Sequence, residues 1–314
     1  MSKVMLIVAD SLRWDYASSL MWGEMFDESV WTRMRTHDTY TAACMPTLLS
    51  GSTSHKNTDF LRRLIPSDSL LQDRDSVMWS HTFGNEKSML KFGEPGQFDI
   101  RGFDSNDENK ILDWLDESES DELPELIVYH SLITHWPFGL EEDNDDIEFV
   151  DGVYIDDKRN FEWSHENYEK GVRSMVSRVR AIEELLPDEY TIVLTSDHGE
   201  GLGENGVMGH IEDIDTGVAD WVHHPEKIEE EVSWSGVEKN CWTIEVPLAI
   251  NDSDIELMND MMLMDVRGVV ENILDDESDH AIPHFYEEWD VEFLGDEYSD
   301  MGSVEEQLEA LGYK

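Results

Sequence analysis

The chain has 314 residues, of which 72 are acidic and 22 are basic, and its formal net charge at pH 7 is −50. Such a charge repels nucleic acid and anionic membranes, which excludes partners recognised through a phosphate backbone. The acidic residues are scattered among plentiful aliphatic and aromatic ones, so we expect a folded enzyme adapted to concentrated salt. A disordered chain or a nucleic-acid mimic fits this composition less well.

The length fits one large domain, with or without a small appendage. No apolar segment is as long as a membrane span, and the first residues already form a core strand without a basic leader. The two cysteines, Cys44 and Cys241, are too few for a disulfide framework. We therefore expect a soluble protein in a high-salt cytoplasm.

The predicted elements alternate between strands and helices. Short apolar runs typical of buried strands lie at residues 4–9, 76–80, 126–130, 190–195 and 244–250. The clearest helix runs from Ser164 to Leu186 and carries an apolar stripe. This alternation predicts an α/β fold with a mostly parallel sheet covered on both faces. Segments 141–157 and 213–231 are predicted to be acidic loops, and the methionines of residues 258–264 to be core residues.

Acidic residues follow two of the predicted strands directly. Asp10 comes after the first strand, and Asp197 and His198 come after the strand at 190–195. Ligands bind at the carboxyl ends of strands in open α/β sheets, so these residues are expected to meet there. Taken singly, each acid is equally well explained as a helix cap or turn residue. Together, two carboxylates and an imidazole form a plausible ligand set for one divalent metal ion.

Several short motifs follow one another along the chain: Asp10-Ser11-Leu12-Arg13, Cys44-Met45-Pro46-Thr47, Thr134-His135-Trp136-Pro137-Phe138, the segment Ser196 to Gly203 with His210, and Val246-Pro247-Leu248. They occur in the order seen in sulfatases, and the chain resembles that family of the alkaline phosphatase superfamily over nearly its whole length. The resemblance implies a three-layer sandwich with a mostly parallel central sheet and helices on both faces. It also implies a catalytic core over residues 1–250, with residues 251–314 forming a short helical extension packed on it.

The resemblance assigns roles to individual residues. Asp10, Asp197 and His198 match metal ligands, and His135 and His210 match residues that contact the transferred sulfuryl or phosphoryl group. Ser11 stands where many sulfatases have a second Asp, so Ca²⁺, Mn²⁺, Zn²⁺ and Mg²⁺ all remain candidates for the single metal. Cys44 matches the cysteine that a formylglycine-generating enzyme oxidises to the catalytic formylglycine.

The nucleophile segment departs from the sulfatase pattern. Thr47 and Leu48 follow Pro46, where the family usually has Ser and Arg. Pro46 suits the first turn of a helix, which predicts that Cys44 lies just before the helix begins. Counting back from Gly51 by the family's spacing leads instead to Thr41, and relatives that transfer phosphoryl groups use an unmodified Thr. Cys44 is the first candidate nucleophile, with Thr41 and Thr47 as alternatives.

The predicted function is a metal-dependent hydrolysis of sulfate or phosphate esters through a covalent intermediate at a helix N-terminus. The substrate is expected to be a small-molecule or glycan ester. Two alternatives stay open: a phosphodiesterase or phosphotransferase with a Thr nucleophile, and a catalytically silent relative that acts as a binding protein.

Overall fold

The structure of the protein is a computed structural model. It describes residues 2–26, 29–36, 39, 41–51, 64–65, 69–72, 74–80, 91–92, 98–102, 109–135, 138, 159–202, 208–209, 244–252, 254–258 and 261–275.

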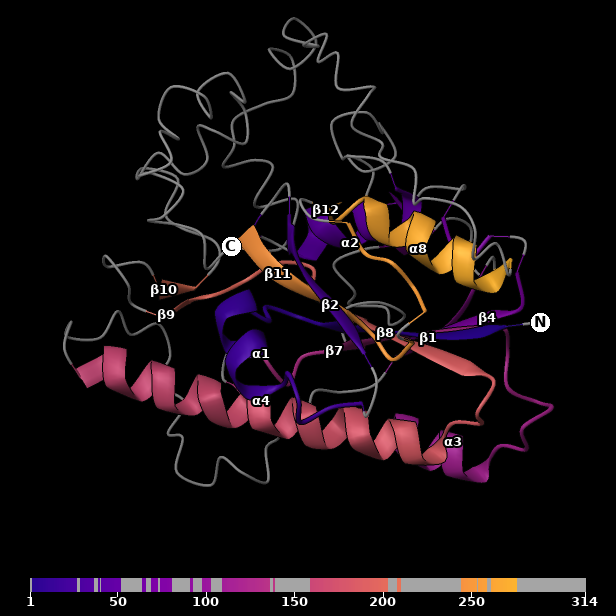
Figure 1. The fold of residues 1–314 in the computed structure, drawn as a ribbon, viewed down its shortest axis with the longest axis horizontal. Coiled ribbons are helices and arrows are strands. Elements are labelled where there is room, and N and C mark those ends of the chain that lie inside the picture. Colours follow the sequence, from indigo (N-terminus) through magenta and orange to yellow (C-terminus); the bar gives the residue numbers. More distant parts are fainter. Residues whose placement is uncertain are drawn as a thin grey trace, which may run out of the picture.

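A single mixed sheet of eight strands forms the centre of the fold (Figure 1). Its strands, in spatial order, are β12 (Met261–Met262), β2 (Val30–Arg35), β11 (Glu245–Ile250), β8 (Tyr190–Thr195), β1 (Lys3–Ala9), β7 (Leu126–Ser131), β4 (Ser76–Ser80) and β6 (Asp99–Gly102). The five strands from β8 to β6 are parallel, whereas β11 runs antiparallel to both β8 and β2. The mostly parallel sheet is confirmed, and all five predicted strand runs are strands of it.

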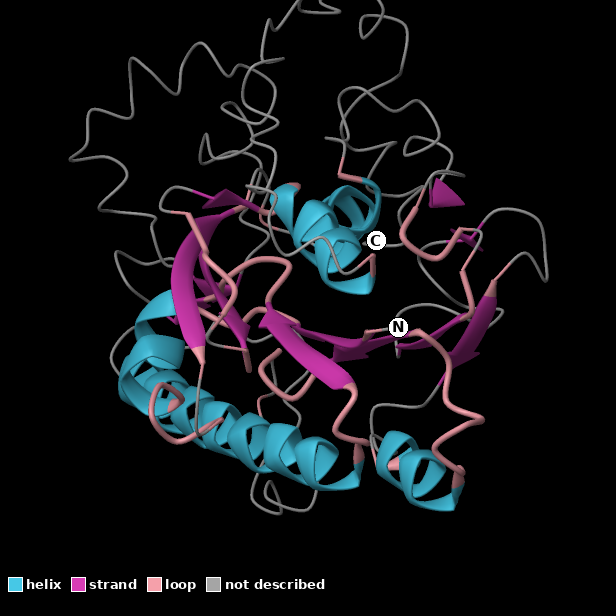
Figure 2. Cartoon of the chain, turned by 45° about the vertical axis from the view of Figure 1, so that its right-hand side comes forward, coloured by secondary structure: helices cyan, strands magenta, loops and turns pink. Residues whose placement is uncertain are grey.

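Helices cover both faces of this sheet (Figure 2). The elements on one face are α1 (Trp14–Leu20), α3 (Lys110–Glu117) and α4 (Arg159–Leu185), and those on the other are α2 (Thr41–Ser50) and α8 (Asp265–Leu274). Two small ribbons lie outside the main sheet, β3 (Leu64–Ile65) with β5 (Lys91–Phe92), and β9 (Gly201–Leu202) with β10 (Met208–Gly209). The predicted three-layer architecture is therefore confirmed.

Each face of the sheet buries its own apolar cluster, because side chains alternate between faces along a strand. On β1, Val4, Leu6 and Val8 join the cluster that packs against α2 and α8. The intervening residues Met5 and Ile7 join the cluster beneath α1, α3 and α4. Since residues 4–9 of β1 are fully buried, the strand forms a fixed centre, and Asp10 follows directly after it.

The longest helix, α4, begins five residues before its predicted start and ends one residue before its predicted end. Its stripe of fully buried side chains faces the sheet: Tyr168, Val172, Met175, Val179 and Ile182. A short turn, in which the amide of Tyr190 donates to the carbonyl of Pro187, leads directly into β8. Packing of α4 therefore fixes the strand that carries the Asp197 motif.

The segment after residue 250 contributes to the same sheet and core. β12 pairs in parallel with β2, and α8 packs on the α2 side of the sheet. Met261 and Met264 are buried, as expected for core methionines. The division at residue 250 remains a prediction, and the two predicted acidic loops, 141–157 and 213–231, lie outside the described residues.

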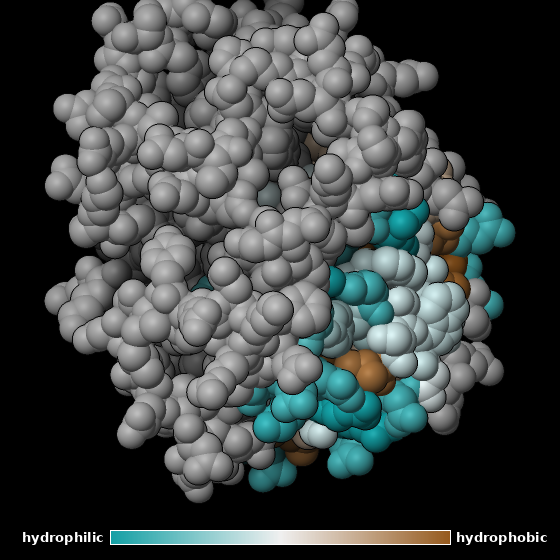
Figure 3. All heavy atoms as spheres, turned by 90° about the vertical axis from the view of Figure 1, so that its left-hand side faces the viewer, coloured by the Kyte–Doolittle hydropathy of each residue, from teal (hydrophilic) through white to brown (hydrophobic). Residues whose placement is uncertain are grey.

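The described surface agrees with the composition. On the face shown in Figure 3, hydrophilic side chains predominate and hydrophobic ones form only small, separate patches. Among the described residues, Trp22 is the exposed large hydrophobic side chain. No helix in the described part of the chain combines the length and the apolar character needed to cross a membrane.

The end of α2 provides a test of the fold. Gly51 has φ 68°, and a β-carbon there would lie 3.1 Å from Cδ of Arg267. That arginine is held in place because its Nη1 donates to the carbonyl of Ser50 at 2.6 Å. Gly51→Ala should therefore lower the free energy of unfolding by more than the ~1–2 kcal/mol expected for a left-handed backbone alone.

The matched control is Gly23→Ala, because Gly23 has φ 82° but no atom within 4 Å of the position that a β-carbon would take. In this variant the free energy of unfolding should fall only by the cost of placing alanine in a left-handed backbone conformation. Urea unfolding in concentrated KCl measures both variants, and equal losses would contradict the steric contribution at Gly51.

Candidate active site

The predicted metal ligands meet at the carboxyl ends of two neighbouring parallel strands. Asp10 follows β1 directly, and Asp197 lies two residues beyond the end of β8. One ligand atom from each of Asp10, Asp197 and His198 lies within 4.8 Å of the others. All three side chains are at most 1 % exposed. The structure thus brings together the two carboxylates and the imidazole in a site removed from solvent.

Hydrogen bonding defines which nitrogen of His198 faces the carboxylates. Nδ1 lies 2.9 Å from the carbonyl oxygen of Gly199, and since a carbonyl only accepts, Nδ1 carries the proton. In the neutral ring, the lone pair on Nε2 then faces Oδ1 of Asp10 at 3.6 Å and Oδ2 of Asp197 at 3.4 Å. Three electron-rich atoms converge in this way, which is the arrangement expected around a cation.

Asp197 has one satisfied oxygen and one that has no hydrogen bond. Its Oδ1 accepts from the backbone amides of Ser11 at 3.2 Å and His198 at 2.9 Å. Its Oδ2 is buried and makes no hydrogen bond. Because a buried carboxylate oxygen without a hydrogen bond is costly, this atom favours the binding of a cation. The donor set of two carboxylates and one imidazole fits a divalent metal ion.

Asp10 stays ionised despite its burial. Burial raises its pKa, but the charge of His135 and the hydrogen bond from His130 offset this and hold the pKa well below its usual range. Within the described part of the chain, the basic side chains that lie against Asp10 and Asp197 are His130 and His198. A pair of carboxylates whose partners are histidines rather than lysine or arginine again favours a bound cation.

Thr41 is the alternative nucleophile that the structure places in this cluster. Its Oγ1 lies 3.0 Å from Oδ2 of Asp10 and 3.2 Å from Nε2 of His198. Thr41 is also the first residue of α2, so the first backbone amides of that helix point towards the same region. The hydroxyl therefore lies next to two of the three candidate metal ligands and at a helix N-terminus suited to anions.

The predicted start of this helix is wrong. α2 begins at Thr41, three residues before Cys44, and Pro46 lies inside it. The helix continues through the proline because Met45, Leu48 and the following residues are buried against the sheet. Cys44 is fully buried in that apolar cluster rather than lying ahead of the helix, and Thr47 is fully buried one turn further on.

Of the two histidines expected to contact the transferred group, the structure describes one. His135 lies in a turn after β7, is partly buried, and its charge acts on Asp10. His210 lies outside the described residues and directly follows β10. The structure therefore places His135 in the turn after β7, the strand that pairs with β1.

Sequence reasoning missed His130, which is fully buried near the end of β7. Its Nε2 lies 3.1 Å from Oδ2 of Asp10, and its Nδ1 lies 3.0 Å from Oγ of Ser80 at the end of β4. A signal was present in the sequence, because the row of alternate residues Leu126, Val128 and His130 ends in a polar side chain. A polar residue that ends an apolar row at a carboxyl strand end indicates a site.

A second missed feature holds the loop after β1 in a strained shape. Ser11 has φ 66°, and its carbonyl accepts from the hydroxyl of Tyr168 at 2.7 Å. The guanidinium of Arg13 binds both oxygens of Asp15 and donates to the carbonyl of Glu200 at 3.2 Å. Burial raises the pKa of Tyr168 well above its usual value, so this phenol remains a neutral donor. The contacts tie the Asp10 loop to the Asp197 loop and to α4.

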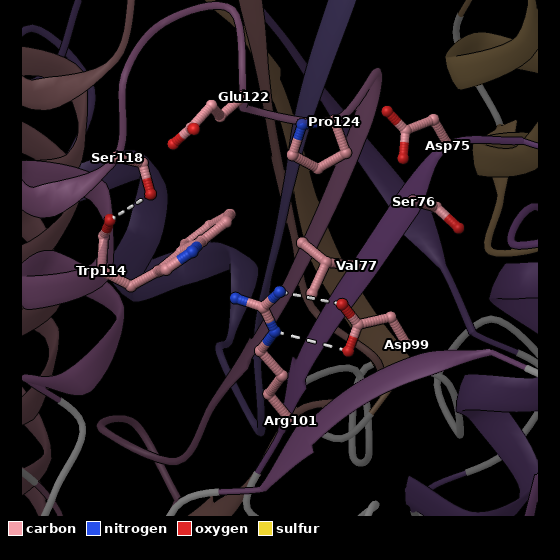
Figure 4. Close-up of a pocket in the computed structure, with 9 residues that line it drawn as sticks. All are labelled: Asp75, Ser76, Val77, Asp99, Arg101, Trp114, Ser118, Glu122 and Pro124. Atoms are coloured by element: carbon pink, nitrogen blue, oxygen red, sulfur yellow. Dashed lines mark hydrogen bonds and ion pairs between the residues drawn. The ribbon is translucent and has the colours of Figure 1, made fainter. Parts of the chain in front are cut away.

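A cavity of about 230 Å³ lies elsewhere in the molecule (Figure 4). Asp75 and Pro124, which line it, come just before β4 and β7, so the cavity lies at the opposite, amino ends of these strands. Arg101 projects into it but is paired with Asp99 at 2.9 Å and lies against the ring of Trp114. The cavity is therefore separate from the cluster of Asp10, Asp197 and His198.

Comparisons with known proteins agree with this fold. No family model matches the chain. Among curated proteins, the low-salt glycan biosynthesis sulfotransferase Agl7 of Haloferax volcanii is 29% identical over 213 residues, covering 66% of this chain. The match spans 48% of that relative, so the chain corresponds to about half of its length.

Solved structures with low sequence identity share the fold. The soluble domain of lipooligosaccharide phosphoethanolamine transferase A from Neisseria meningitidis has a TM-score of 0.59 at 16% identity, covering 87% of this chain and 88% of that one. The periplasmic domain of EcEptC from Escherichia coli, solved in complex with Zn, gives 0.58 at 14% identity, covering 87% and 82%. The yidJ protein of Bacteroides fragilis, named as a candidate sulfatase, gives 0.54 at 11% identity, covering 90% and 75%.

The expected resemblance is therefore confirmed by two independent kinds of likeness, one in sequence and one in fold. The neighbours include transferases as well as sulfatases. The chain has the alkaline phosphatase-like fold of these sulfatases and transferases, and part of its sequence is similar to that of a glycan sulfotransferase.

Proposed function

We propose that this protein is a metal-dependent sulfotransferase that moves a sulfuryl group through Thr41 to a hydroxyl group of a glycan. The observation that carries the proposal is the position of the Thr41 hydroxyl, 3.0 Å from Asp10 and 3.2 Å from His198 at the start of α2. The sequence likeness to a glycan sulfotransferase supports the choice of group and acceptor. Simple hydrolysis is the same chemistry with water as the acceptor.

The metal would be held by Asp10, Asp197 and His198, whose ligand atoms lie within 4.8 Å of one another. When bound, such an ion supplies positive charge that lowers the pKa of a neighbouring hydroxyl and stabilises the oxygens of a transferred anion. Its identity is left open by two carboxylates and one imidazole, which suit several divalent metals.

In the first step, Oγ1 of Thr41 attacks the sulfur of a sulfate ester. The bond between sulfur and the ester oxygen breaks, and the leaving oxygen takes up a proton. Thr41 gives up its own proton to bulk water in this step, and until then its hydroxyl donates a hydrogen bond to Oδ2 of Asp10. We assign His135 to protonate the leaving oxygen, because it lies in the turn that follows β7 at the carboxyl end of the sheet and its side chain is only partly buried.

In the second step, the acceptor hydroxyl attacks the sulfur of the threonyl sulfate. The acceptor loses its proton, the bond from sulfur to Oγ1 breaks, and Thr41 regains a proton. His135 and His210 are the groups proposed to accept and return protons in this step. The backbone amides at the start of α2 would stabilise the oxygens of the bound sulfuryl group.

Cys44 is not the nucleophile in this proposal. Its side chain is fully buried in the apolar cluster between α2 and the sheet, where an aldehyde hydrate would be placed among aliphatic side chains. The formylglycine route and its modifying enzyme therefore become the less favoured alternative. Thr47 is also fully buried, and Thr41 alone of the three lies against Asp10 and His198.

A second candidate is the transfer of a phosphoryl-containing group. The observation in its favour is the fold likeness to phosphoethanolamine transferases, combined with an unmodified threonine at the site.

The excess of 50 negative charges supports activity in concentrated salt, and location in a high-salt cytoplasm is part of the proposal.

The metal site is tested with Asp197→Ala. We expect this variant to lose bound divalent metal and turnover together, because it removes the buried oxygen that makes no hydrogen bond. Elemental analysis after purification and titration calorimetry measure the metal. Asp254→Ala is the matched control, since Asp254 is exposed on the described surface and should leave both unchanged. Full metal content in Asp197→Ala would remove this residue from the ligand set.

The nucleophile is tested with Thr41→Ala, Thr41→Ser and Cys44→Ala. Thr41→Ala should lower kcat by about 10⁴-fold or more, as expected when a covalent nucleophile is removed, while the serine variant keeps a hydroxyl and measurable activity. Cys44→Ala should remain active at temperatures where it is folded. The opposite ranking, with Cys44→Ala inactive and Thr41→Ala active, would restore the formylglycine route.

The transferred group is tested by mass spectrometry of the trapped intermediate. With an aryl sulfate donor and no acceptor, the peptide that contains Thr41 should gain the mass of one sulfuryl group. Adding a glycan acceptor should discharge it and yield sulfated glycan faster than free sulfate. Labelling only by phosphate ester donors would favour the second candidate, and free sulfate as the sole product would identify a hydrolase.

A further inference from the structure

A chain of buried side chains leads from the site across three strands. Ser80 ends β4, His130 lies near the end of β7 and Asp10 follows β1. Strand pairing places Ser80 opposite His130, and His130 opposite Val8, the residue two before Asp10. The three polar side chains are at most 1 % exposed. They occupy the end of a row that is otherwise aliphatic.

The hydrogen bonds in this chain run in one direction. Oδ2 of Asp10 is an acceptor, so Nε2 of His130 donates to it across 3.1 Å. In the neutral ring, Nδ1 of His130 is then an acceptor, and the hydroxyl of Ser80 donates a hydrogen bond to it at 3.0 Å. This order makes Ser80 the group that sets the ring orientation, and His130 the group that sets the carboxylate orientation.

We infer that His130, oriented by Ser80, is a positioning residue that presents Asp10 to the metal. This inference rests on the proposed metal site. The imidazole shares Oδ2 with the hydroxyl of Thr41, which also donates to it. Oδ1 accepts from Oγ of Ser11 at 2.9 Å and faces Nε2 of His198 at 3.6 Å, so the donated hydrogen bonds fix the plane of the carboxylate. Outer hydrogen bonds of this kind orient ligands in metal sites and raise their affinity.

The burial of His130 makes a purely structural role a poor explanation. An aliphatic residue would continue the row of Leu126 and Val128 and would pack without a polar group to satisfy. The imidazole is instead satisfied on one side by Ser80, and its other nitrogen donates to Asp10. Both polar residues thus serve the carboxylate at the strand end.

The experiment measures metal affinity in metal-free protein, independently of turnover. His130→Leu removes the donor to Asp10, and His130→Gln keeps an amide N–H near the position of Nε2. Ser80→Ala removes only the group that orients the ring. We expect His130→Leu to raise the dissociation constants for Zn²⁺ and Mn²⁺ by about 10–100-fold. His130→Gln should recover most of this loss, and Ser80→Ala should lie between the wild type and His130→Leu.

His165→Leu is the matched control, because His165 is another histidine whose ring bonds to a side chain, that of Tyr16, but it lies on α4. Its metal affinity should equal that of the wild type. Thermal unfolding of each metal-free variant identifies any that fail to fold. If His130→Leu does not fold, Ser80→Ala and His130→Gln carry the test, and a wild-type affinity in Ser80→Ala then overturns the inference.

The outcomes separate this inference from the proposed function. A wild-type protein that binds metal, an Asp197→Ala variant that does not, and His130 variants with unchanged affinity would overturn the positioning role alone. A wild-type protein that binds no divalent metal would overturn both. Equal losses in His130→Leu and His130→Gln would also contradict the positioning role, because they would show that the donated hydrogen bond is not what matters.

Discussion

Two carboxylates buried side by side at the ends of β1 and β8 are the constraint on which the rest of this structure depends. Burying one carboxylate is costly, and burying two within reach of one cation requires every other oxygen to be occupied. The structure meets this need with backbone amides on Asp197 and with side-chain donors on Asp10. The loops must therefore hold fixed shapes, which explains the strained Ser11 and its anchoring by Tyr168.

The parts of the fold that could be predicted are those with strong local patterns. The strands β1, β7 and β8 are apolar runs, which indicates burial on both faces of the sheet. The helix α4 carries a stripe of apolar side chains, which indicates burial on one face. β2 has no such pattern, because Arg33 and Arg35 alternate with its apolar residues and pair with Glu245 on β11. Its place in the sheet depends on this distant partner, which local reasoning could not supply.

The site shows the same division. Asp10, Asp197 and His198 could be found because each closely follows a predicted strand. The start of α2 could not be fixed, because Pro46 is a local signal for a helix start while the packing of Met45 and the residues beyond it decides otherwise. His130 was hidden because its role depends on the strand pairing that brings β7 beside β1 and β4.

The strong negative charge of the molecule and the anionic group it is proposed to transfer are compatible because they act over different distances. In concentrated salt the Debye length shrinks to about 3 Å, so surface carboxylates no longer repel a sulfate ester at long range. Buried charges are screened far less, and the site keeps its attraction for an anion through a helix N-terminus and the proposed cation. The surface therefore sets the conditions under which the protein works, while the buried site alone selects the anion.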